Sequence, residues 1–460
     1  MFEQQLSPYL DCQRWIVGYS GGLDSTVLLH ACQTLLKRLS SERAVRNATA
    51  PRLPELVAVH VDHQLMPEHL DWVAHCQHFC ERQQIALELQ TVDVLVDGQG
   101  LENAARNARY AVFSRYIDTP HHLLLSAHHQ HDQAETVLLR LFRGAGMHGV
   151  GAMSTIRPFF SGRLARPFLG IPRGVLQTYA NEHQLDYLED PSNADDKFDR
   201  NFVRRTVLPL IAERWTAVES SLARFAGHAA DNERLARDLA HLDVSSGLRG
   251  SKTYGECLQI ESLSILASYR RANIYRFWLG TLGEKMPSTA RLEEIDALVL
   301  GKRAGSKLIF RDYSLHVHSD GLYWVSNTWL SALDGFFMQP LTWKTAEVLA
   351  VKSIGTLCVA TGGERDGLTP GEYQIGIRAD GIECRLNGQS KPLKKLLQKA
   401  AIPAWLRDRY PIIYCVQSDG SRQVAAIGDQ YICDDYRCPQ GGAVNWHYDF
   451  DHQATKQLNW

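Results

Sequence analysis

The stretch WIVGYSGGLDSTVLLHAC, Trp15 to Cys32, runs from an apolar segment through SGGLDS (residues 20–25) into a segment with helical spacing. An apolar run that stops at two glycines predicts a buried strand and a tight turn, because glycine lets the backbone bend close to a ligand. The free N–H groups and the positive dipole end of the next helix point at whatever lies in that turn. The stretch therefore predicts an anion site at a strand-to-helix junction.

The residue types in this turn narrow the kind of anion. The hydroxyl groups of Ser20, Ser25 and Thr26 can donate to phosphate oxygens, but the turn lacks the lysine of Gly-x-x-x-x-Gly-Lys-Ser/Thr loops. Asp24 would repel phosphate unless a cation lies between them, so we expect Asp24 to bring Mg²⁺ to a polyphosphate. On spacing alone, a plain glycine-rich helix start with Asp24 as a first-turn dipole partner is the alternative.

Length and composition favour a multidomain globular protein. The chain has 460 residues, of which 45% are hydrophobic and 22% charged, and this length predicts two to four domains. No apolar run approaches the roughly 18 residues of a membrane span, and the first residues lack the features of a signal peptide. We therefore expect a cytoplasmic protein. The net charge of −2 means that any nucleic acid must be held by local basic clusters.

The cysteines carry little signal. None of the ten forms a Cys-x-x-Cys pair, so we expect neither a disulfide framework nor a zinc ribbon. Cys76 and Cys80, with His75 and His78 nearby, could suggest a metal site, but buried thiols beside surface imidazoles are the commoner arrangement.

Strand and helix patterns alternate through the first half, which predicts βαβ units and a parallel sheet. The expected strands are 14–20, 56–61, 86–94 and 122–127, and the expected helices are 26–39, 67–84, 102–117 and 133–142. Beyond this α/β domain (1–215) we expect a helical linker (216–245), a helical-plus-hairpin domain (246–335) and a small α+β domain (345–445).

Further motifs follow the turn in chain order: VDHQL (61–65), ENAARNARY (102–110), AHHQHDQAETVLLRLFRG (127–144), RPFL (166–169), EDPSN (189–193), RNFVR (200–204) and KKLLQKAAIPAWLRDR (394–409). Together with SGGLDS they resemble the PP-loop, or N-type, ATP pyrophosphatases, and within that group the tRNA(Ile)-lysidine synthetases. The likeness runs from residue 15 to beyond residue 400. Met66, where the family usually has Arg, and Leu397, Lys399 and Ala404 depart from its pattern.

This resemblance implies a Rossmann-like PP-loop domain and a ligase that consumes ATP. The implied reaction joins L-lysine to C2 of the wobble cytidine in the CAU anticodon of tRNA(Ile), releases AMP and pyrophosphate, and changes the tRNA identity from methionine to isoleucine. It also implies that both later domains bind tRNA. Neither a membrane nor an obligatory protein partner is indicated.

The resemblance assigns roles to particular residues. ATP would be bound by Ser20, Gly21, Gly22, Leu23, Asp24, Ser25, Arg106 and Arg109, with Asp24 also holding the metal. His128, Asp132 and Glu135 would line the lysine pocket, and which of them is the general base is open. Contacts with tRNA would come from Asn193, Arg200, Asn201, Arg204, Lys394, Lys395 and Arg407.

Each of these groups also has a structural interpretation. Arg106 and Arg109 could form a solvated basic face, and Asp132 and Glu135 could simply suit a helix start. The histidines near them resemble a metal cluster. Asn193 to Arg204 could form an ordinary turn, and the lysines of 391–409 a solvated helix face, although Trp405 and Tyr410 beside them favour RNA.

Three other functions fit parts of the sequence. A PP-loop tRNA thiolase uses the same loop but generally needs paired cysteines, and an iron–sulfur absorption band would indicate one. An amidotransferase-type ligase would need a nucleophile where the chain has Phe2. A non-catalytic RNA-binding protein would consume no ATP.

Overall fold

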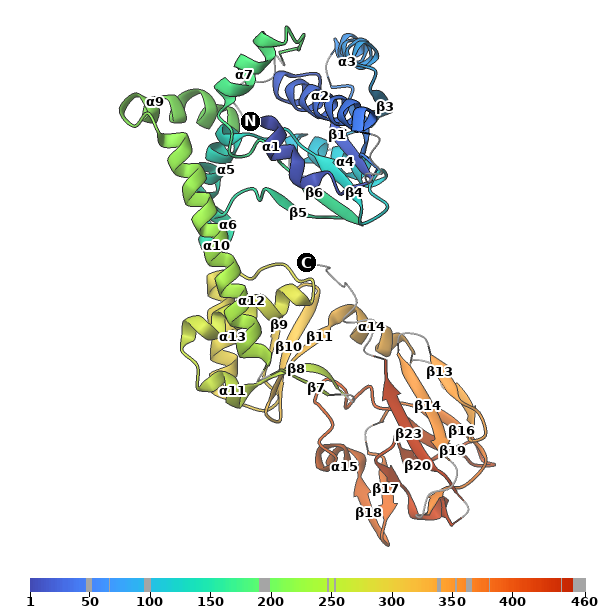
Figure 1. Cartoon of the computed structure of the whole chain (residues 1–460). Coiled ribbons are helices and arrows are strands. Elements are labelled where there is room, and N and C mark those ends of the chain that lie inside the picture. Colours follow the sequence, from blue (N-terminus) through green and yellow to red (C-terminus); the bar gives the residue numbers. More distant parts are fainter. Residues whose placement is uncertain are drawn as a thin grey trace. The chain divides into compact units, whose positions relative to one another are not determined.

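The computed structural model describes residues 1–46, 52–65, 67–94, 101–189, 199–245, 248–251, 254–336, 341–351, 354–360, 366–379, 381–439 and 441–449. The chain divides into two compact units, Met1–Leu235 and a second unit from Ala236 onward (Figure 1). No helix in the described part of the chain is both long and apolar enough to cross a membrane.

The first unit is built on a six-stranded sheet of order β3-β2-β1-β4-β6-β5. Its strands are β1 (Arg14–Gly18), β2 (Glu55–Asp62), β3 (Ala86–Thr91), β4 (His122–Leu125), β5 (Ile156–Phe159) and β6 (Gly162–Ala165). All neighbouring strands are parallel except β5, which pairs antiparallel with β6 at the edge. The predicted parallel α/β fold is confirmed, while the β5–β6 hairpin was not expected.

Helices cover both faces of this sheet (Figure 1). Trp15 and Val17 face one way and pack against α2, α3 and α7, whereas Ile16 faces the other way and packs against α4. Side chains alternate along a strand, so a strand buried on both faces has a continuous apolar run, as β1 has from Trp15 to Val17. The helical elements are α1 (Phe2–Leu6), η1 (Ser7–Tyr9), α2 (Leu23–Arg46), α3 (His69–Gln83), α4 (Leu101–Ser114), α5 (Gln130–Phe142), α6 (Met147–Val150), α7 (Arg173–Glu182), α8 (Asp199–Phe202), η3 (Val203–Val207), α9 (Leu208–Arg214) and α10 (Val218–Ser245).

Helices and an antiparallel sheet form the first part of the second unit. The helical part of the domain expected over 246–335 consists of α11 (Ile260–Ser264), α12 (Ser268–Thr281) and α13 (Thr289–Gly301). They pack on a sheet of order β7-β8-β11-β10-β9, with β7 (Leu248–Ser251), β8 (Gly255–Gln259), β9 (Lys307–Ile309), β10 (Tyr313–His318) and β11 (Gly321–Ser326). The expected hairpin turns between His318 and Gly321, and α14 (Asn327–Phe336) follows it.

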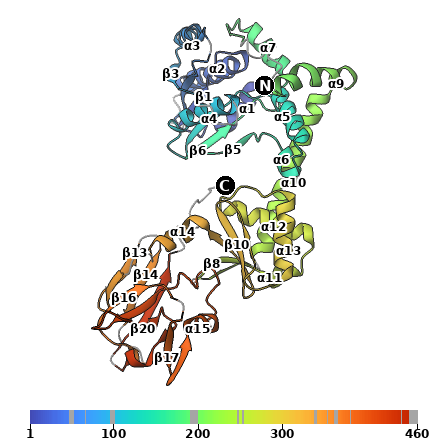
Figure 2. The same ribbon diagram turned by 180° about the vertical axis from the view of Figure 1, so that it is seen from behind.

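The last part of the chain, orange to red in Figures 1 and 2, is mostly antiparallel β structure. Its larger sheet has the order β12-β16-β19-β20-β21 and its smaller one β13-β14-β23. The elements are β12 (Leu341–Lys344), β13 (Leu349–Val351), β14 (Gly355–Ala360), β15 (Gly367–Leu368), β16 (Glu372–Gly376), β17 (Glu383–Leu386), β18 (Gln389–Pro392), α15 (Leu393–Lys399), β19 (Ile412–Val416), β20 (Arg422–Ile427), β21 (Tyr431–Ile432), η4 (Asp434–Tyr436), β22 (Arg437–Cys438) and β23 (Ala443–Tyr448).

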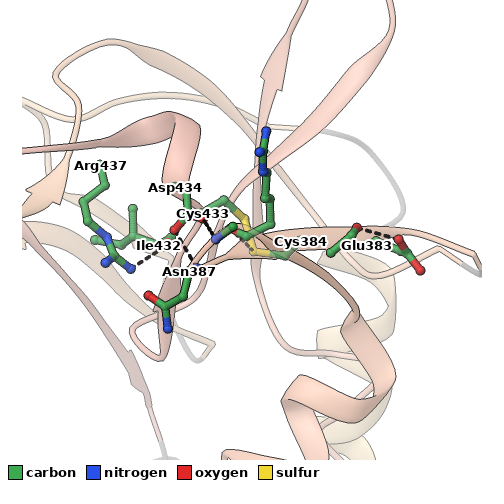
Figure 3. Close-up of a disulfide and its surroundings, with 10 residues drawn as sticks. Glu383, Cys384, Asn387, Ile432, Cys433, Asp434 and Arg437 are labelled. Atoms are coloured by element: carbon green, nitrogen blue, oxygen red, sulfur yellow. Dashed lines mark hydrogen bonds between the residues drawn. A yellow bond between two sulfur atoms is a disulfide. The ribbon is translucent and has the colours of Figure 1, made fainter.

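One disulfide, between Cys384 and Cys433, corrects the expectation drawn from the cysteines (Figure 3). The two residues are 49 positions apart, and their Cα atoms lie 5.8 Å apart because the β17–β18 hairpin packs beside β20 and η4. Asp434, next to Cys433, accepts hydrogen bonds from the backbone N–H groups of Asn387 and Gly388 at the hairpin tip. Disulfide and carboxylate together fix the hairpin that leads into α15.

Candidate active site

The loops that follow β1 and β4 meet at the carboxyl edge of the first sheet. These two strands are neighbours although β2 and β3 lie between them in sequence, so the chain crosses to opposite sides of β1. Open α/β sheets bind ligands at such a point. His129 Nε2, after β4, lies 3.5 Å from Oδ2 of Asp24, after β1. Two predicted parts of the site, the glycine turn and the segment from His128 to Glu135, are thus brought together.

Helix α3 packs closely against the backbone of the glycine turn. Gly21 has φ +78°, and a Cβ atom there would lie 3.0 Å from Sγ of Cys76 and 3.3 Å from the Trp72 ring. Trp72 Nε1 donates to the carbonyl of Ser20 at 2.8 Å. Helix α2 begins at Leu23, so its first N–H groups lie beside the turn. A glycine is therefore required at Gly21, and the turn has the form of a phosphate cradle.

Asp24 has the orphaned oxygen that a bound cation would satisfy. Its Oδ1 atom is buried and has no hydrogen-bond partner among the described residues. A buried carboxylate oxygen without a donor is costly, and oxygen ligands of this kind suit Mg²⁺. The geometry therefore fits the metal role expected for Asp24. No group of three or more His, Cys, Asp or Glu side chains within the described residues could hold a metal by itself.

Cys76 and Cys80 lie beneath the turn as buried thiols. Burial raises the pKa of each thiol to about 12. They are therefore protonated at neutral pH and unsuited to act as nucleophiles or cluster ligands.

A partly buried ion cluster joins α5 to the segment formed by α8 and η3. Arg200 Nε lies 2.6 Å from Glu135 Oε2, and Arg200 Nη2 lies 2.9 Å from Asp132 Oδ1. Arg204 Nε lies 2.5 Å from Glu135 Oε1, and its Nη2 lies 3.4 Å from Asp132 Oδ1. The two carboxylates predicted to receive a cationic amino acid are thus paired with arginines of the chain itself.

These arginines keep both carboxylates ionised. Burial would raise the pKa of Glu135, but hydrogen bonds from His131 and Arg204 and the charge of Arg200 outweigh it and lower this pKa to about 2. The pKa of Asp132 is also lowered against the effect of burial, by the imidazoles of His129 and His128 and by Arg200. Since a group with a low pKa is a weak proton acceptor, neither carboxylate is suited to be the general base in this arrangement.

His131 connects the same cluster to α10. Its Nε2 lies 3.2 Å from Glu135 Oε1 and its Nδ1 lies 2.7 Å from Glu219 Oε1. Burial would lower the pKa of His131, but the hydrogen bonds with Glu135 and Glu219 raise it to about 9. An imidazolium therefore bridges two carboxylates at neutral pH.

The pKa of His128 is shifted in the opposite direction from that of His131. The pKa of His128 is lowered to about 3, chiefly by burial; the charge of Asp132 opposes this shift, and those of Arg166, Arg200 and Arg106 add to it. Its Nδ1 shares a hydrogen bond with the hydroxyl of Ser126 at 2.7 Å. The imidazole is therefore neutral at neutral pH.

Two of the arginines that act on the pKa of this imidazole, Arg106 and Arg166, come from other parts of the first unit. Arg106 and Arg109 are exposed on α4; the Arg106 guanidinium lies 4.9 Å from the centroid of the Tyr110 ring, and Arg109 Nη2 lies 3.4 Å from His63 Nε2. Arg166, in the RPFL motif, is buried and donates to the carbonyl of Ser154 at 2.8 Å. Its side chain makes no ion pair with an acid among the described residues. A buried cation of this kind favours an anionic ligand nearby.

The residues predicted to contact tRNA near EDPSN and RNFVR lie partly inside the ion cluster and partly outside the described residues. Arg200 and Arg204 belong to the ion cluster, and Asn201 between them is buried. Asn193 and Met66 lie outside the described residues.

Helix α15 presents its lysines to solvent. Lys394 and Lys395 are exposed while Leu393, Leu396 and Leu397 are buried, which gives an amphipathic helix with a basic outer face. Arg407 Nε donates to the carbonyl of Ile402.

The aromatic residues beside α15 correct another expectation. Trp405 and Tyr410 are only 6% and 2% exposed and belong to the core of the second unit, and the Tyr410 hydroxyl donates to Asp429. They stabilise the fold and offer no ring to an RNA base.

Sequence reasoning missed His131, Glu219 and Arg166 as members of the site. Arg166 could have been found, because it opens a recognised motif. Glu219 had no signal, since its pairing with His131 depends on how α10 packs against α5.

Three family models match the chain. One described as a PP-loop domain matches residues 2–211, one described as the TilS substrate binding domain matches 258–323, and one described as the TilS substrate C-terminal domain matches 374–448.

Full-length relatives are also similar to the chain. The tRNA(Ile)-lysidine synthase of Pseudomonas aeruginosa is 36% identical and covers 89% of each chain. Those of Yersinia pseudotuberculosis and Coxiella burnetii are 35% and 33% identical, covering 95% and 96% of this chain and 96% and 93% of their own.

The bridge made by His131 predicts a pH-dependent stability. Because the folded state raises the pKa of His131 from 6.5 to about 9, its contribution is fully present below pH 6.5 and is lost as the pH rises through 9. We expect His131→Gln to lower the free energy of unfolding at pH 6, by at most about 3 kcal/mol, and by much less at pH 10. Urea denaturation of both proteins across this range measures the difference.

The exposed His121 supplies the matched control, because His121→Gln should leave stability unchanged at every pH. A deficit for His131→Gln that stays constant between pH 6 and pH 10 would contradict the bridge.

Proposed function

Because the chain belongs to the tRNA(Ile)-lysidine synthase family, we propose that it joins L-lysine to C2 of the wobble cytidine in a CAU-anticodon tRNA(Ile). ATP is cleaved to AMP and pyrophosphate, and the tRNA changes identity from methionine to isoleucine. The observation that carries this proposal is the similarity to such synthases over 89% of the chain. The reaction is assigned to the cytoplasm, where the tRNA is used.

The glycine turn is assigned to the pyrophosphate part of ATP. Its closely packed Gly21, the serine hydroxyls and the N-terminus of α2 form a cradle for phosphate oxygens. Asp24 and its orphaned oxygen would hold Mg²⁺, which when bound offsets the charge of the phosphates. Arg106 and Arg109, which are exposed on α4, are assigned to the same anion.

The reaction has two steps, because the C2 oxygen of cytidine is a very poor leaving group. The cytidine leaves its stack, and transfer of AMP to this oxygen makes it a good leaving group. The ε-amine of lysine then attacks C2 and expels AMP. For this attack the ammonium group must first lose a proton.

His128 is assigned as the proton acceptor. Asp132 and Glu135 are engaged by arginines, whereas the imidazole of His128 is neutral. Its low pKa arises in part from Arg166, Arg200 and Arg106. Burial is the main cause of this low pKa, so substrate phosphates that offset the arginines would remove only their part of the lowering and make His128 a better base than it is without substrate.

Asp132 and Glu135 are assigned to recognition of the lysine amine. An incoming ammonium must compete with the arginines, and the weakest contact is the one of 3.4 Å between Arg204 Nη2 and Asp132. Displaced from Asp132, Arg204 would be available to an RNA phosphate. The RNA loop that carries this phosphate is also assigned to Arg200, Asn201 and Asn193. More distant phosphates are assigned to the lysines of α15 and to Arg407.

The order of the two steps provides the decisive experiment. Only a docked anticodon supplies the oxygen that attacks the α-phosphorus, so ATP–pyrophosphate exchange should require CAU tRNA and proceed without lysine. Exchange should stop when the wobble cytidine is replaced by uridine. Exchange supported by lysine and ATP alone would instead indicate a ligase that activates a carboxylate.

Loss of the metal-binding carboxylate should affect chemistry and spare RNA binding. We expect Asp24→Asn to lower the rate of adenylation by at least about 100-fold while the Kd for tRNA changes less than threefold. Single-turnover kinetics and filter binding measure the two quantities. Asp186→Asn, at an exposed carboxylate, is the control, and unchanged turnover of Asp24→Asn at saturating Mg²⁺ would refute the assignment.

The basic face of α15 should act on affinity alone. Replacing Lys394, Lys395 and Lys399 together by Gln should weaken tRNA binding and reduce its log–log salt slope by about 2, at about 0.7 to 0.9 per phosphate contact. Turnover at saturating tRNA should be unchanged. The matched triple replacement by Arg keeps the charges and should keep the slope. An unchanged slope in the Gln variant would mean that these lysines are only solvated.

A further inference from the structure

A surface hollow of about 650 Å³ lies where α9 ends and α10 begins. Its lining includes Ile211, Arg214, Trp215, Val218, Ser221 and Leu222. Ligand sites commonly have volumes of roughly 300 to 1,000 Å³, so the hollow is large enough for a nucleotide. None of its lining residues has a role in the proposed reaction.

The hollow is lined by an exposed indole and a cation. Trp215 is 62% exposed, and the Arg214 guanidinium lies 5.8 Å from the centroid of its ring. Among the described residues that line the hollow, Arg214 is the one with a charge, so the hollow favours an anionic partner. An exposed indole beside a guanidinium suits a nucleotide. A base can stack on the indole ring, and the guanidinium can bind the phosphate.

The hollow also lies beside the catalytic cluster. Glu219, one turn into α10, is hydrogen-bonded to His131 of α5 at 2.7 Å. Leu222 packs against the cluster formed by Ala134 and Leu138, which belong to the same helix as Asp132 and Glu135. On its other side, α8, η3 and α9 run without a break from Arg200 to Arg214. A ligand in the hollow would therefore adjoin the site of reaction.

From these features we infer that the hollow receives an unpaired base of the anticodon loop, a neighbour of the wobble cytidine. The base stacks on the face of Trp215, and Arg214 contacts its phosphate. This inference rests on the proposed function, since a cytidine that leaves its stack needs its neighbours held in place. Trp215 and Arg214 are therefore positioning residues for the RNA.

The test compares two anticodon stem-loops, one intact and one abasic at the nucleotide beside the cytidine. We expect Trp215→Ala to weaken binding of the intact RNA about tenfold and Trp215→Phe, which keeps a flat ring, less than threefold. The abasic RNA should bind the unmodified protein about tenfold more weakly than the intact RNA, and Trp215→Ala should weaken it no further. The abasic site is placed in turn on each side of the cytidine. If Trp215→Ala weakens binding of the intact and the abasic RNA equally in both cases, the inference is wrong.

Two variants and one assay keep the result interpretable. Arg214→Gln should weaken both RNAs alike, because it removes a phosphate contact, whereas Leu210→Ala, at a nearby residue that is 65% exposed, should weaken neither. Lysidine formation by the unmodified full chain tests the proposed function separately from the hollow. If Trp215→Ala instead turns a dimer into a monomer in light scattering, the hollow is an interface between copies and the inference is overturned.

Discussion

The packing around the active site depends on the need to compensate the buried carboxylate of Glu135. This side chain is fully buried and ionised, so it must have cations within contact distance. Arg200 and Arg204 supply them from a segment 65 or more residues away, and His131 adds a third partner. That requirement holds α8 and η3 against α5 and, through Glu219, holds the start of α10 there as well. One buried charge thus organises α5, α8, η3 and the start of α10.

In the structure, arginines of the chain itself neutralise the carboxylates of this cluster. In the proposed reaction, a lysine amine and RNA phosphates would share those partners. Exchange of partners among buried ions avoids leaving any charge uncompensated, which would be the most costly outcome. The neutral imidazole of His128 lies among arginines whose charges substrate phosphates would offset.

Much of the first unit could be predicted because its signals are local. The core of β1 is apolar, SGGLDS follows that strand after a single residue, and Gly21 within it has no room for a side chain. The pairing of Glu135 with Arg200 and Arg204 could not be predicted, since spacing does not reveal which charges meet after folding. For the same reason Trp405 was expected beside RNA and is instead buried, and the bond from Cys384 to Cys433 had no sequence pattern. The roles of the individual site residues stay predictions.

The π-helical turn at η3, Val203–Val207, restricts how this region can change during evolution. Each residue in a regular helix rotates the next by about 100°, so a wider turn resets which side chains share a face. Deleting or inserting one residue here would turn Arg204 and all of α9 relative to Arg200. A change in the length of this segment would therefore disturb the pairing of Arg200 and Arg204 with Glu135, whereas a substitution elsewhere in it need not. Homologues should therefore differ here by substitution and not by insertion or deletion.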